Sequence, residues 1–412
     1  MTDRADHAGT ARRRIAILAG DGVGPEVMAE AVRVLKVVSE ATGAVFEFDE
    51  LPFGGAAVDL AGDPLPAATE RACLESDAVL LGAVGGPRWE DEPAARRPEA
   101  GLLRLRERLG VFANLRPVRL GRGLRRQSPL RDEVLATGVD VLIVRELTGG
   151  LYYGDRGSRR DRTGVRAFDT LVYTDAEVER IVRLAFDLAR RRRRRVAEFD
   201  KSNVLETSRL WRRVTAEVAS EYDDVGVELY YVDNGFLQFV RDPARFDVVV
   251  TENTFGDLLS DLGAAVVGSL GVLPSASLGE EGTPGIFEPV HGSAPDIAGR
   301  GIANPIGAVL SAAMMLRYAF GMEREAQAVE DAVDEVLEHG PWTADLAPPG
   351  VEPVGTSAVG SALAGIVRRR LAASPAPAAG WPPNDGIRYW LAGDHGFRPV
   401  FADDELPPGV AK

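Results

Sequence analysis

Short apolar runs rich in β-branched residues alternate along this chain with longer stretches whose apolar positions recur at helical spacing. The runs predict strands at 15–19, 45–50, 78–83, 139–145, 196–200, 227–233 and 246–251. The longer stretches predict helices at 25–42, 176–189, 206–222, 255–268 and 357–372, and a helical block from 305 to about 338. Since the two periods alternate almost throughout, the sequence predicts an α/β fold.

Two segments depart from this alternation. Residues 151–173 are polar, rich in Gly and Arg and only weakly alternating, so they form either a projecting hairpin arm or a long loop. Beyond Ala373, prolines at 375, 377, 382 and 383 exclude a continuous helix. Five aromatic residues in the same stretch favour packing over free disorder. We interpret residues 373–412 as an appendage.

Composition is that of an ordinary globular protein. The chain has 412 residues, of which 45% are hydrophobic, enough for two or three lobes. No apolar run reaches the roughly 20 residues of a membrane span, and none near Met1 is typical of a signal peptide. Cys73 is the only cysteine, which excludes an internal disulfide. We therefore expect a cytoplasmic protein with no membrane partner.

Charge adds two observations. The formal net charge of −14 opposes nucleic-acid binding, although six consecutive arginines, Arg190 to Arg195, could support it locally. We interpret that run as the solvated end of a helix, where cations are favourable. The only lysines are Lys36, Lys201 and Lys412. Because a desolvated lysine can release a proton near neutral pH and an arginine cannot, Lys201 is a candidate base.

A glycine-rich turn, Gly20-Asp21-Gly22-Val23-Gly24-Pro25, follows the first predicted strand and opens a helix. It resembles a dinucleotide-binding fingerprint but lacks the third glycine, because residue 25 is proline. A tight strand-to-helix turn explains the pattern equally well, so nucleotide binding stays open at this point.

Carboxylates gather around a second predicted helix. Asp257 and Asp261 are four residues apart, which places both on one helix face. Like charges there repel each other unless a cation lies between them, although a helix N-terminus also favours carboxylates without one. Asp233 is predicted to end a strand and could converge on the same point. Three carboxylates without a histidine would suit Mg2+ or Mn2+ if the fold brings them together.

Three arginines lie on separate stretches of the chain: Arg106, Arg116 and Arg145. Arg145 ends an apolar strand, which is an unusual place for a charge that does not face a ligand. Forked guanidinium groups bind carboxylates through two hydrogen bonds, so these arginines indicate an acidic substrate.

Together these motifs resemble one family over residues 14–372, the β-decarboxylating isocitrate/isopropylmalate dehydrogenases, and most closely its isopropylmalate members. The matching stretches are GDGVGPEV (20–27), LLGAVGGP (80–87), FANLRP (112–117), VRELTGGLYYG (144–154), DKSNVLETSRLWR (200–212), FGDLLSDL (255–262), GSLGVLPSASLG (268–279) and FEPVHGSAPDIAGRGIANP (287–305).

The resemblance implies a two-lobed α/β fold that is not a Rossmann domain, with the active-site cleft between the lobes. Residues 1–112 and 268–372 would form a cofactor-binding lobe. Residues 113–267 would form a substrate and dimerisation lobe, with a hairpin arm at about 151–173. The protein would be a homodimer whose subunits share their active sites.

The resemblance also implies residue roles. Arg106, Arg116 and Arg145 would bind the substrate carboxylates, and Tyr152 and Lys201 would be the acid–base pair. The metal ligands would be Asp233, Asp257 and Asp261, with Lys201 and Asp233 supplied by the partner subunit; Asp233 would also contact substrate. The residues expected to bind the cofactor are His291, Gly292, Ser293, Ala294, Pro295, Asp296, Ile297 and Asn304.

A pocket for a branched alkyl group is implied at Glu99, Leu102, Leu103 and Val204, because two leucines and a valine form an apolar wall. This chain departs from the family at Arg104, which would weaken an alkyl preference if it faced that pocket. Helical spacing predicts that it turns outward.

The expected reaction is NAD-dependent oxidation and decarboxylation of 3-isopropylmalate to 2-oxo-4-methylpentanoate, a step of leucine biosynthesis. The metal would be Mg2+ or Mn2+, and Asp296 beside the adenosine ribose would favour NAD over NADP. The same scaffold could serve the 2-hydroxy dicarboxylates isocitrate, homoisocitrate, tartrate or malate. A non-catalytic binding protein is the alternative from another class, and the presence of Lys201, Tyr152 and all three aspartates opposes it.

Overall fold

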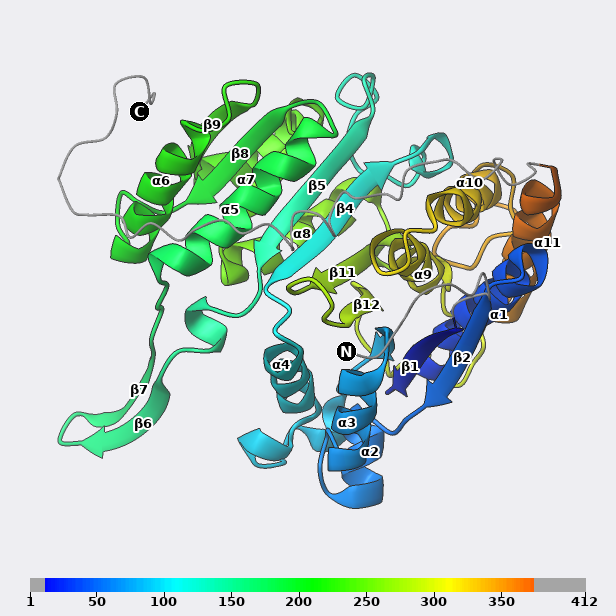
Figure 1. The fold of residues 1–412 in the computed structure, drawn as a ribbon, viewed down its shortest axis with the longest axis horizontal. Coiled ribbons are helices and arrows are strands. Elements are labelled where there is room, and N and C mark those ends of the chain that lie inside the picture. The colour runs from blue at the N-terminus through cyan, green and yellow to red at the C-terminus, as the bar shows by residue number, and fades with distance from the viewer. Residues whose placement is uncertain (1–11, 374–412) are drawn as a thin grey trace, which may run out of the picture. The chain divides into compact units, whose positions relative to one another are not determined.

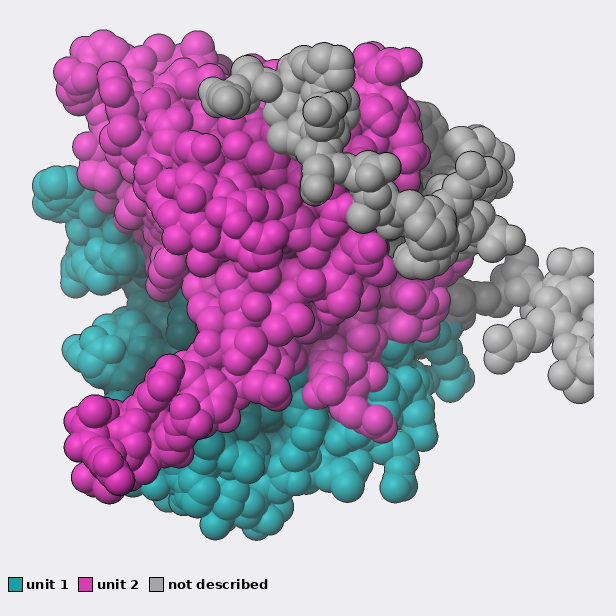
Figure 2. Space-filling model, turned by 90° about the vertical axis from the view of Figure 1, so that its left-hand side faces the viewer, with its two compact units in different colours: residues 1–105, 284–383 teal, residues 106–283, 384–412 magenta. Residues whose placement is uncertain are grey.

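The computed structural model describes residues 12–373. The segment 374–412, and with it the predicted packing of the appendage, lies outside the described residues. The described chain divides into two compact units, which Figure 2 colours separately. Unit 1 contains residues 12–105 and 284–373, and unit 2 contains residues 106–283. The roles assigned to the two predicted lobes stay predictions.

Unit 1 is built on parallel strands. In spatial order they are β2 (Val45–Glu50), β1 (Arg12–Gly20), β3 (Ala78–Ala83) and β12 (Gly285–Pro289). Its helices are α1 (Gly24–Thr42), α2 (Gly54–Ala61), α3 (Ala67–Glu75), α9 (Ile306–Tyr318), α10 (Glu323–His339) and α11 (Thr356–Ala373). Pro25 fits the first turn of α1, and Gly43 ends that helix in the left-handed conformation, φ 77°.

Unit 2 contains a mixed sheet. Its strands, in spatial order, are β11 (Pro274–Leu278), β4 (Ala113–Leu120), β5 (Val139–Glu146), β10 (Val248–Thr251), β8 (Arg195–Asp200) and β9 (Gly226–Tyr231). β4 is antiparallel to both neighbours, whereas β5, β10, β8 and β9 are parallel (Figure 1). The helices are α5 (Asp175–Arg190), α6 (Glu206–Ala219), α7 (Val232–Arg241) and α8 (Asn253–Val267). Helix α4 (Pro98–Leu109) crosses the division of the chain at residue 105.

The carboxyl ends of these four parallel strands meet at one edge of the sheet, the usual position of ligands in such sheets. Arg145 lies near the end of β5, and Lys201 follows β8. Asp233 follows β9 in the first turn of α7, and α8 begins just after β10. The topology of unit 2 therefore places several candidate site residues along one edge.

The segment 151–173 contains an antiparallel hairpin, β6 (Arg156–Asp161) and β7 (Gly164–Asp169). Its side chains are mostly exposed, and it extends away from the other strands of unit 2 (Figure 1). Of the two interpretations of this segment, the hairpin is confirmed. Short 3-10 turns complete the described elements: η1 (Pro87–Trp89), η2 (Ala94–Arg96), η3 (Arg122–Leu124), η4 (Gly150–Tyr152), η5 (Pro243–Arg245) and η6 (Leu270–Val272).

Three local expectations need correction. Asp233 does not end a strand, because β9 stops at Tyr231 and α7 begins at Val232. The helical block after 305 is two helices, interrupted before Gly321, which has a φ of 63°. The arginine run is not only a solvated helix end, since Arg192 forms an ion pair of 2.8 Å with the fully buried Asp247.

In the described part of the chain, no helix has the length and apolarity needed to cross a membrane.

Candidate active site

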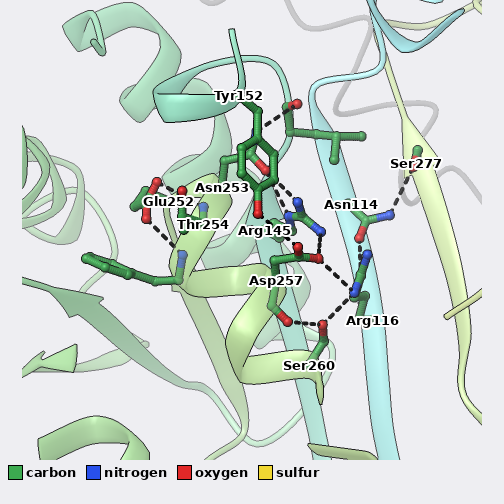
Figure 3. Close-up of polar contacts among 12 residues, drawn as sticks. Asn114, Arg116, Arg145, Tyr152, Glu252, Asn253, Thr254, Asp257, Ser260 and Ser277 are labelled. Atoms are coloured by element: carbon green, nitrogen blue, oxygen red, sulfur yellow. Dashed lines mark hydrogen bonds and ion pairs between the residues drawn. The ribbon is translucent and has the colours of Figure 1, made fainter. Parts of the chain in front are cut away.

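Arg145 is a buried cation at the carboxyl edge of unit 2. It follows the apolar core of β5, and only 2% of the residue is exposed. Its Nε and Nη2 donate to Asn253 Oδ1 at 3.0 and 2.7 Å, and its Nη1 donates to Asp257 (Figure 3). Burial lowers the pKa of Arg145, and the charge of Asp257 opposes that shift. The guanidinium remains charged at neutral pH, as arginine does in proteins.

Asp257 is the carboxylate on which this group converges. The Tyr152 hydroxyl donates to its Oδ2 at 3.0 Å, and Arg116 Nη1 lies 3.5 Å from its Oδ1. Burial opposes ionisation of Asp257, but Arg145 and Arg116 outweigh it, so the pKa of this carboxyl is lowered. Burial and the same carboxylate raise the pKa of the Tyr152 hydroxyl. Asp257 is therefore ionised at neutral pH, and Tyr152 keeps its proton.

Arg116 is held on β4 by polar side chains on both sides. Its Nε donates to Asn114 Oδ1 at 2.6 Å, and its Nη1 donates to the Ser260 hydroxyl of α8. Asn114 in turn donates to Ser277 Oγ at 2.9 Å (Figure 3). Neither Asn114 nor these serines were identified from the sequence, where nothing distinguishes them from other polar residues.

Asp261 lies one helical turn beyond Asp257. Burial and the neighbouring Asp257 charge raise the pKa of the Asp261 carboxyl. A cation between the two would relieve that repulsion, so these oxygens fit a divalent metal. Among the described residues of one chain, however, no three His, Cys, Asp or Glu side chains are placed to hold a metal. Convergence of all three aspartates within one chain is thus not observed.

Asp233 instead pairs with Lys201. Lys201 Nζ donates to Asp233 Oδ1, and the two side chains are 29% and 67% exposed. This hydrogen bond lowers the pKa of the Asp233 carboxyl. The two residues that the resemblance assigns to the partner subunit are therefore adjacent to each other, and their delivery to a neighbouring site stays a prediction.

Helix α4 carries most of the remaining substrate candidates. Arg106 is buried, at 7% exposure, and its charge acts on both Asp257 and Arg145. Leu102 and Leu103 are half-buried on the same helix. The Glu99 carboxylate lies against Gly85, where a Cβ would stand 2.3 Å from its Oε1. Val204 follows β8 and is 62% exposed.

Arg104 is half-buried and bound within unit 1. Its Nη2 donates to Asp63 Oδ1 at 2.9 Å and also to the Leu65 carbonyl. The expectation that it turns outward misses these partners, because they lie far away in the sequence. The Arg104 charge is therefore paired with a carboxylate of the loop between α2 and α3.

In unit 1 the glycine-rich turn is organised by Asp21, which sequence reasoning missed as a functional element. Its buried carboxylate accepts from the backbone N–H groups of Gly55, Ala56 and Gly85, each at 2.8 Å. Burial raises the pKa of this carboxyl, and the three N–H groups oppose the shift. Its position between two glycines ahead of a helix was the available signal.

The same turn contacts the segment predicted to bind the cofactor. Val23 N–H donates to the Ser293 carbonyl at 2.8 Å, and a Cβ on Gly22 would stand 1.9 Å from that oxygen. Gly22 also has a φ of 59°, so glycine is required there on both counts. Two motifs about 270 residues apart thus form one surface of unit 1.

Within this segment, His291 Nδ1 lies 2.9 Å from the Gly292 carbonyl. Its Nε2 is buried without a hydrogen-bond partner among the described residues, and burial lowers the pKa of the ring. A buried unpartnered nitrogen fits an added ligand. Asn304 accepts from Ile306 N–H at 3.0 Å and donates to Asp345 at 2.9 Å. The residues between them vary in exposure: Ser293 is buried, Ala294 and Ile297 are half-buried, and Gly292, Pro295 and Asp296 are exposed.

Comparison with known proteins decides the family. The sequence model of the isocitrate/isopropylmalate dehydrogenase family matches residues 14–363. The chain belongs to this family. A 3-isopropylmalate dehydrogenase of Geobacillus kaustophilus is 56% identical over 345 residues, 84% of this chain and 92% of that relative. One of Oleidesulfovibrio alaskensis is 54% identical over 350 residues, 84% of this chain and 98% of that relative.

Solved structures agree with this membership of the isocitrate/isopropylmalate dehydrogenases. An isocitrate dehydrogenase from Methylococcus capsulatus matches with a TM-score of 0.77 at 37% identity, covering 86% of this chain and 99% of that one. A β-decarboxylating dehydrogenase from Thermococcus kodakarensis, in its apo form, matches with a TM-score of 0.70 at 37% identity, covering 87% and 97%. The predicted family and fold are confirmed. Membership implies a nicotinamide cofactor, a divalent metal and a small dicarboxylate substrate.

Proposed function

We propose that this protein oxidises 3-isopropylmalate at its C2 hydroxyl and releases CO2, forming 2-oxo-4-methylpentanoate in leucine biosynthesis. The observation that carries the proposal is the convergence of two buried arginines and a tyrosine on Asp257. The relatives of more than 50% identity named 3-isopropylmalate dehydrogenase favour this substrate within the family.

Arg145 and Arg116 bind the substrate carboxylates, with Arg106 beside them. Both converging guanidiniums are already oriented by neutral partners, Asn253 for Arg145 and Asn114 for Arg116. A preoriented guanidinium loses little entropy when it forms two hydrogen bonds to a carboxylate. The substrate therefore binds with its carboxylates fixed before any bond changes.

Lys201 of the partner subunit acts as the base that removes the C2 hydroxyl proton. Tyr152 then donates its proton to the carbon that lost CO2, and its raised pKa suits a group that is protonated at rest. Asp257 and Asp261, with Asp233 of the partner subunit, would hold a divalent cation, Mg2+ or Mn2+, which would polarise the substrate hydroxyl and carboxylate. The nicotinamide cofactor, when bound, would supply the acceptor for the hydride that leaves C2 as the hydroxyl becomes a carbonyl.

The choice of an alkyl substrate rests on α4. Leu102 and Leu103, with Val204, offer apolar surface, and burying a branched alkyl group there gains about 1.5–3 kcal/mol. Arg104 does not offset this preference, because its guanidinium binds Asp63. Isocitrate would instead need a cationic or polar partner for its third carboxylate.

For the cofactor we propose NAD. His291 to Ile297 and Asn304 would bind its adenosine half. Asp296 is exposed and available to accept hydrogen bonds from the ribose hydroxyls, and its charge would repel the 2′-phosphate of NADP. Ile297 supplies neither a charge nor a hydrogen bond to that phosphate.

The proposed assembly is a cytoplasmic homodimer that binds neither nucleic acid nor a membrane. Sedimentation velocity should give twice the chain mass.

Steady-state kinetics test the function. Purified enzyme is assayed with 3-isopropylmalate, isocitrate, homoisocitrate, tartrate and malate, each with NAD and with NADP, in Mg2+ and in Mn2+. The highest kcat/KM is expected for 3-isopropylmalate with NAD. A higher kcat/KM for another acid would show that the proposed substrate is wrong. Equal kcat/KM with NADP and NAD would show that the proposed cofactor choice is wrong.

A further inference from the structure

Asn253 is a fully buried amide whose hydrogen-bonding groups are all engaged. It opens α8, and its Oδ1 accepts from both Nε and Nη2 of Arg145. Its Nδ2 donates to the carbonyls of Leu147 and Gly149, at 3.1 and 3.0 Å. One side chain therefore joins the end of β5, the loop that follows it and the start of α8 (Figure 3).

The loop joined in this way leads to the acid residue. Leu147 and Gly149 immediately precede η4, which ends at Tyr152. Tyr173 holds the backbone of Asn253 in place, because the Tyr173 hydroxyl accepts a hydrogen bond from Asn253 N–H at 3.0 Å. A Cβ on Gly149 would stand 2.5 Å from the Tyr173 ring, so loop and ring are in close contact. The position of Tyr152 thus depends on the hydrogen bonds of Asn253.

The neutral charge of the Asn253 amide matters as much as its position beside Arg145. A buried guanidinium requires partners for its N–H groups. An aspartate in place of Asn253 would supply them, but would also neutralise Arg145. The amide satisfies two N–H groups and adds no negative charge to the one that Asp257 already brings to Arg145, so a carboxylate ligand meets less repulsion there.

We propose that Asn253 is a positioning residue that orients Arg145 and the Tyr152 loop together while preserving the charge of Arg145 for substrate. The role rests on the proposed function, since it concerns the binding of a dicarboxylate. Asn253 itself contacts no reacting atom.

The test compares two variants with the wild-type enzyme. Asn253→Asp keeps the side-chain shape and both contacts to Arg145, but it adds a negative charge and loses the two donations to the Leu147 and Gly149 carbonyls. Asn253→Ala removes all four side-chain hydrogen bonds and adds no charge. Because both variants release the loop that leads to Tyr152, kcat should fall in both. In Asn253→Asp the KM for 3-isopropylmalate should also rise about tenfold or more, because a charged hydrogen bond to the substrate is weakened, while the KM for NAD stays unchanged.

A matched control separates positioning from general stability. Thr69→Val keeps side-chain shape and removes a buried hydrogen bond of 2.9 Å to the Pro52 carbonyl in unit 1. It should lower the melting temperature without changing either KM. If Asn253→Asp has the wild-type KM for the dicarboxylate, the inference is wrong, whatever its melting temperature. Failure of the proposed function would appear differently, as a wild-type enzyme that does not turn over 3-isopropylmalate.

Discussion

Glu198 provides a stability test that is independent of catalysis. It lies in β8, paired with Val250 of β10 and Leu229 of β9, and is fully buried. Its carboxyl lies beside that of Asp200, and its oxygens have no other hydrogen-bond partner among the described residues. Burial and the adjacent Asp200 carboxylate raise the pKa of Glu198 well above its ordinary value, against an opposing effect of Arg212. The folded protein therefore keeps Glu198 neutral to a higher pH than the unfolded chain does.

The sign and size of the pH dependence follow from this state. Below the ordinary glutamate pKa, both folded and unfolded chains carry the proton. Between that value and the raised folded pKa, only the folded chain carries it, so unfolding releases a proton. The free energy of unfolding then falls by about 1.4 kcal/mol for each pH unit. The stability that the folded chain gains by binding this extra proton is complete at low pH and is lost as the pH rises.

Glu198→Gln removes the titration and nearly preserves the shape. Urea unfolding followed by circular dichroism at pH 5.5, 6.5 and 7.5 should show the free energy of unfolding of the variant rising relative to wild type as the pH rises, by up to about 1.4 kcal/mol per pH unit. The exposed Glu338→Gln is the control for removing a charge without burial. A difference between Glu198→Gln and wild type that is the same at every pH would refute the reasoning, because the folded carboxyl would then not hold an extra proton.

Three further predictions concern the site. Lys201→Met should abolish turnover without unfolding the chain, and a kcat close to wild type in the variant would remove Lys201 from the role of base. Asp257→Asn combined with Asp261→Asn should abolish divalent-metal binding in calorimetry together with turnover; retained binding would place the metal elsewhere. Gly22→Ala should raise the KM for NAD about tenfold or more, because its Cβ would displace the Ser293 carbonyl by roughly 1 Å. Its control, Gly365→Ala, meets no atom within 4 Å and should leave the KM unchanged.

Periodicity was sufficient for strands with a continuous apolar run or a regular alternation, and it failed where polar residues interrupt the pattern. The apolar runs that predicted β2 and β3 match the observed bounds. β4 was missed because Asn114, Arg116 and Pro117 interrupt its apolar pattern, and two of these residues serve the site. β11 was missed because small polar residues, Ser275 and Ser277, are fully buried in it. In both strands, buried polar residues interrupt the apolar pattern that sequence periodicity detects.

Residue identity predicted the charged members of the site but not their supports. Arg145 was found because a cation at the end of an apolar strand is unusual. Asn253, Asn114 and Asp21 were missed because a single amide or carboxylate has many ordinary explanations. Their importance lies in hydrogen bonds to residues 34 to 163 positions away, which no local pattern contains.

The charges of the proposed site favour joint binding of a dicarboxylate and a divalent metal. The buried arginines 106, 116 and 145 contribute three positive charges, and the carboxylates of Asp257 and Asp261 contribute two negative ones. The ion pair between Lys201 and Asp233 adds no net charge. A dicarboxylate entering alone would leave this group with a net negative charge while Asp257 occupies Arg145. A dication held by Asp257 and Asp261 would cancel the two substrate charges and would compete with the arginines for Asp257. Each ligand thus improves the electrostatic environment of the other, since buried charge is tolerated only when it is compensated.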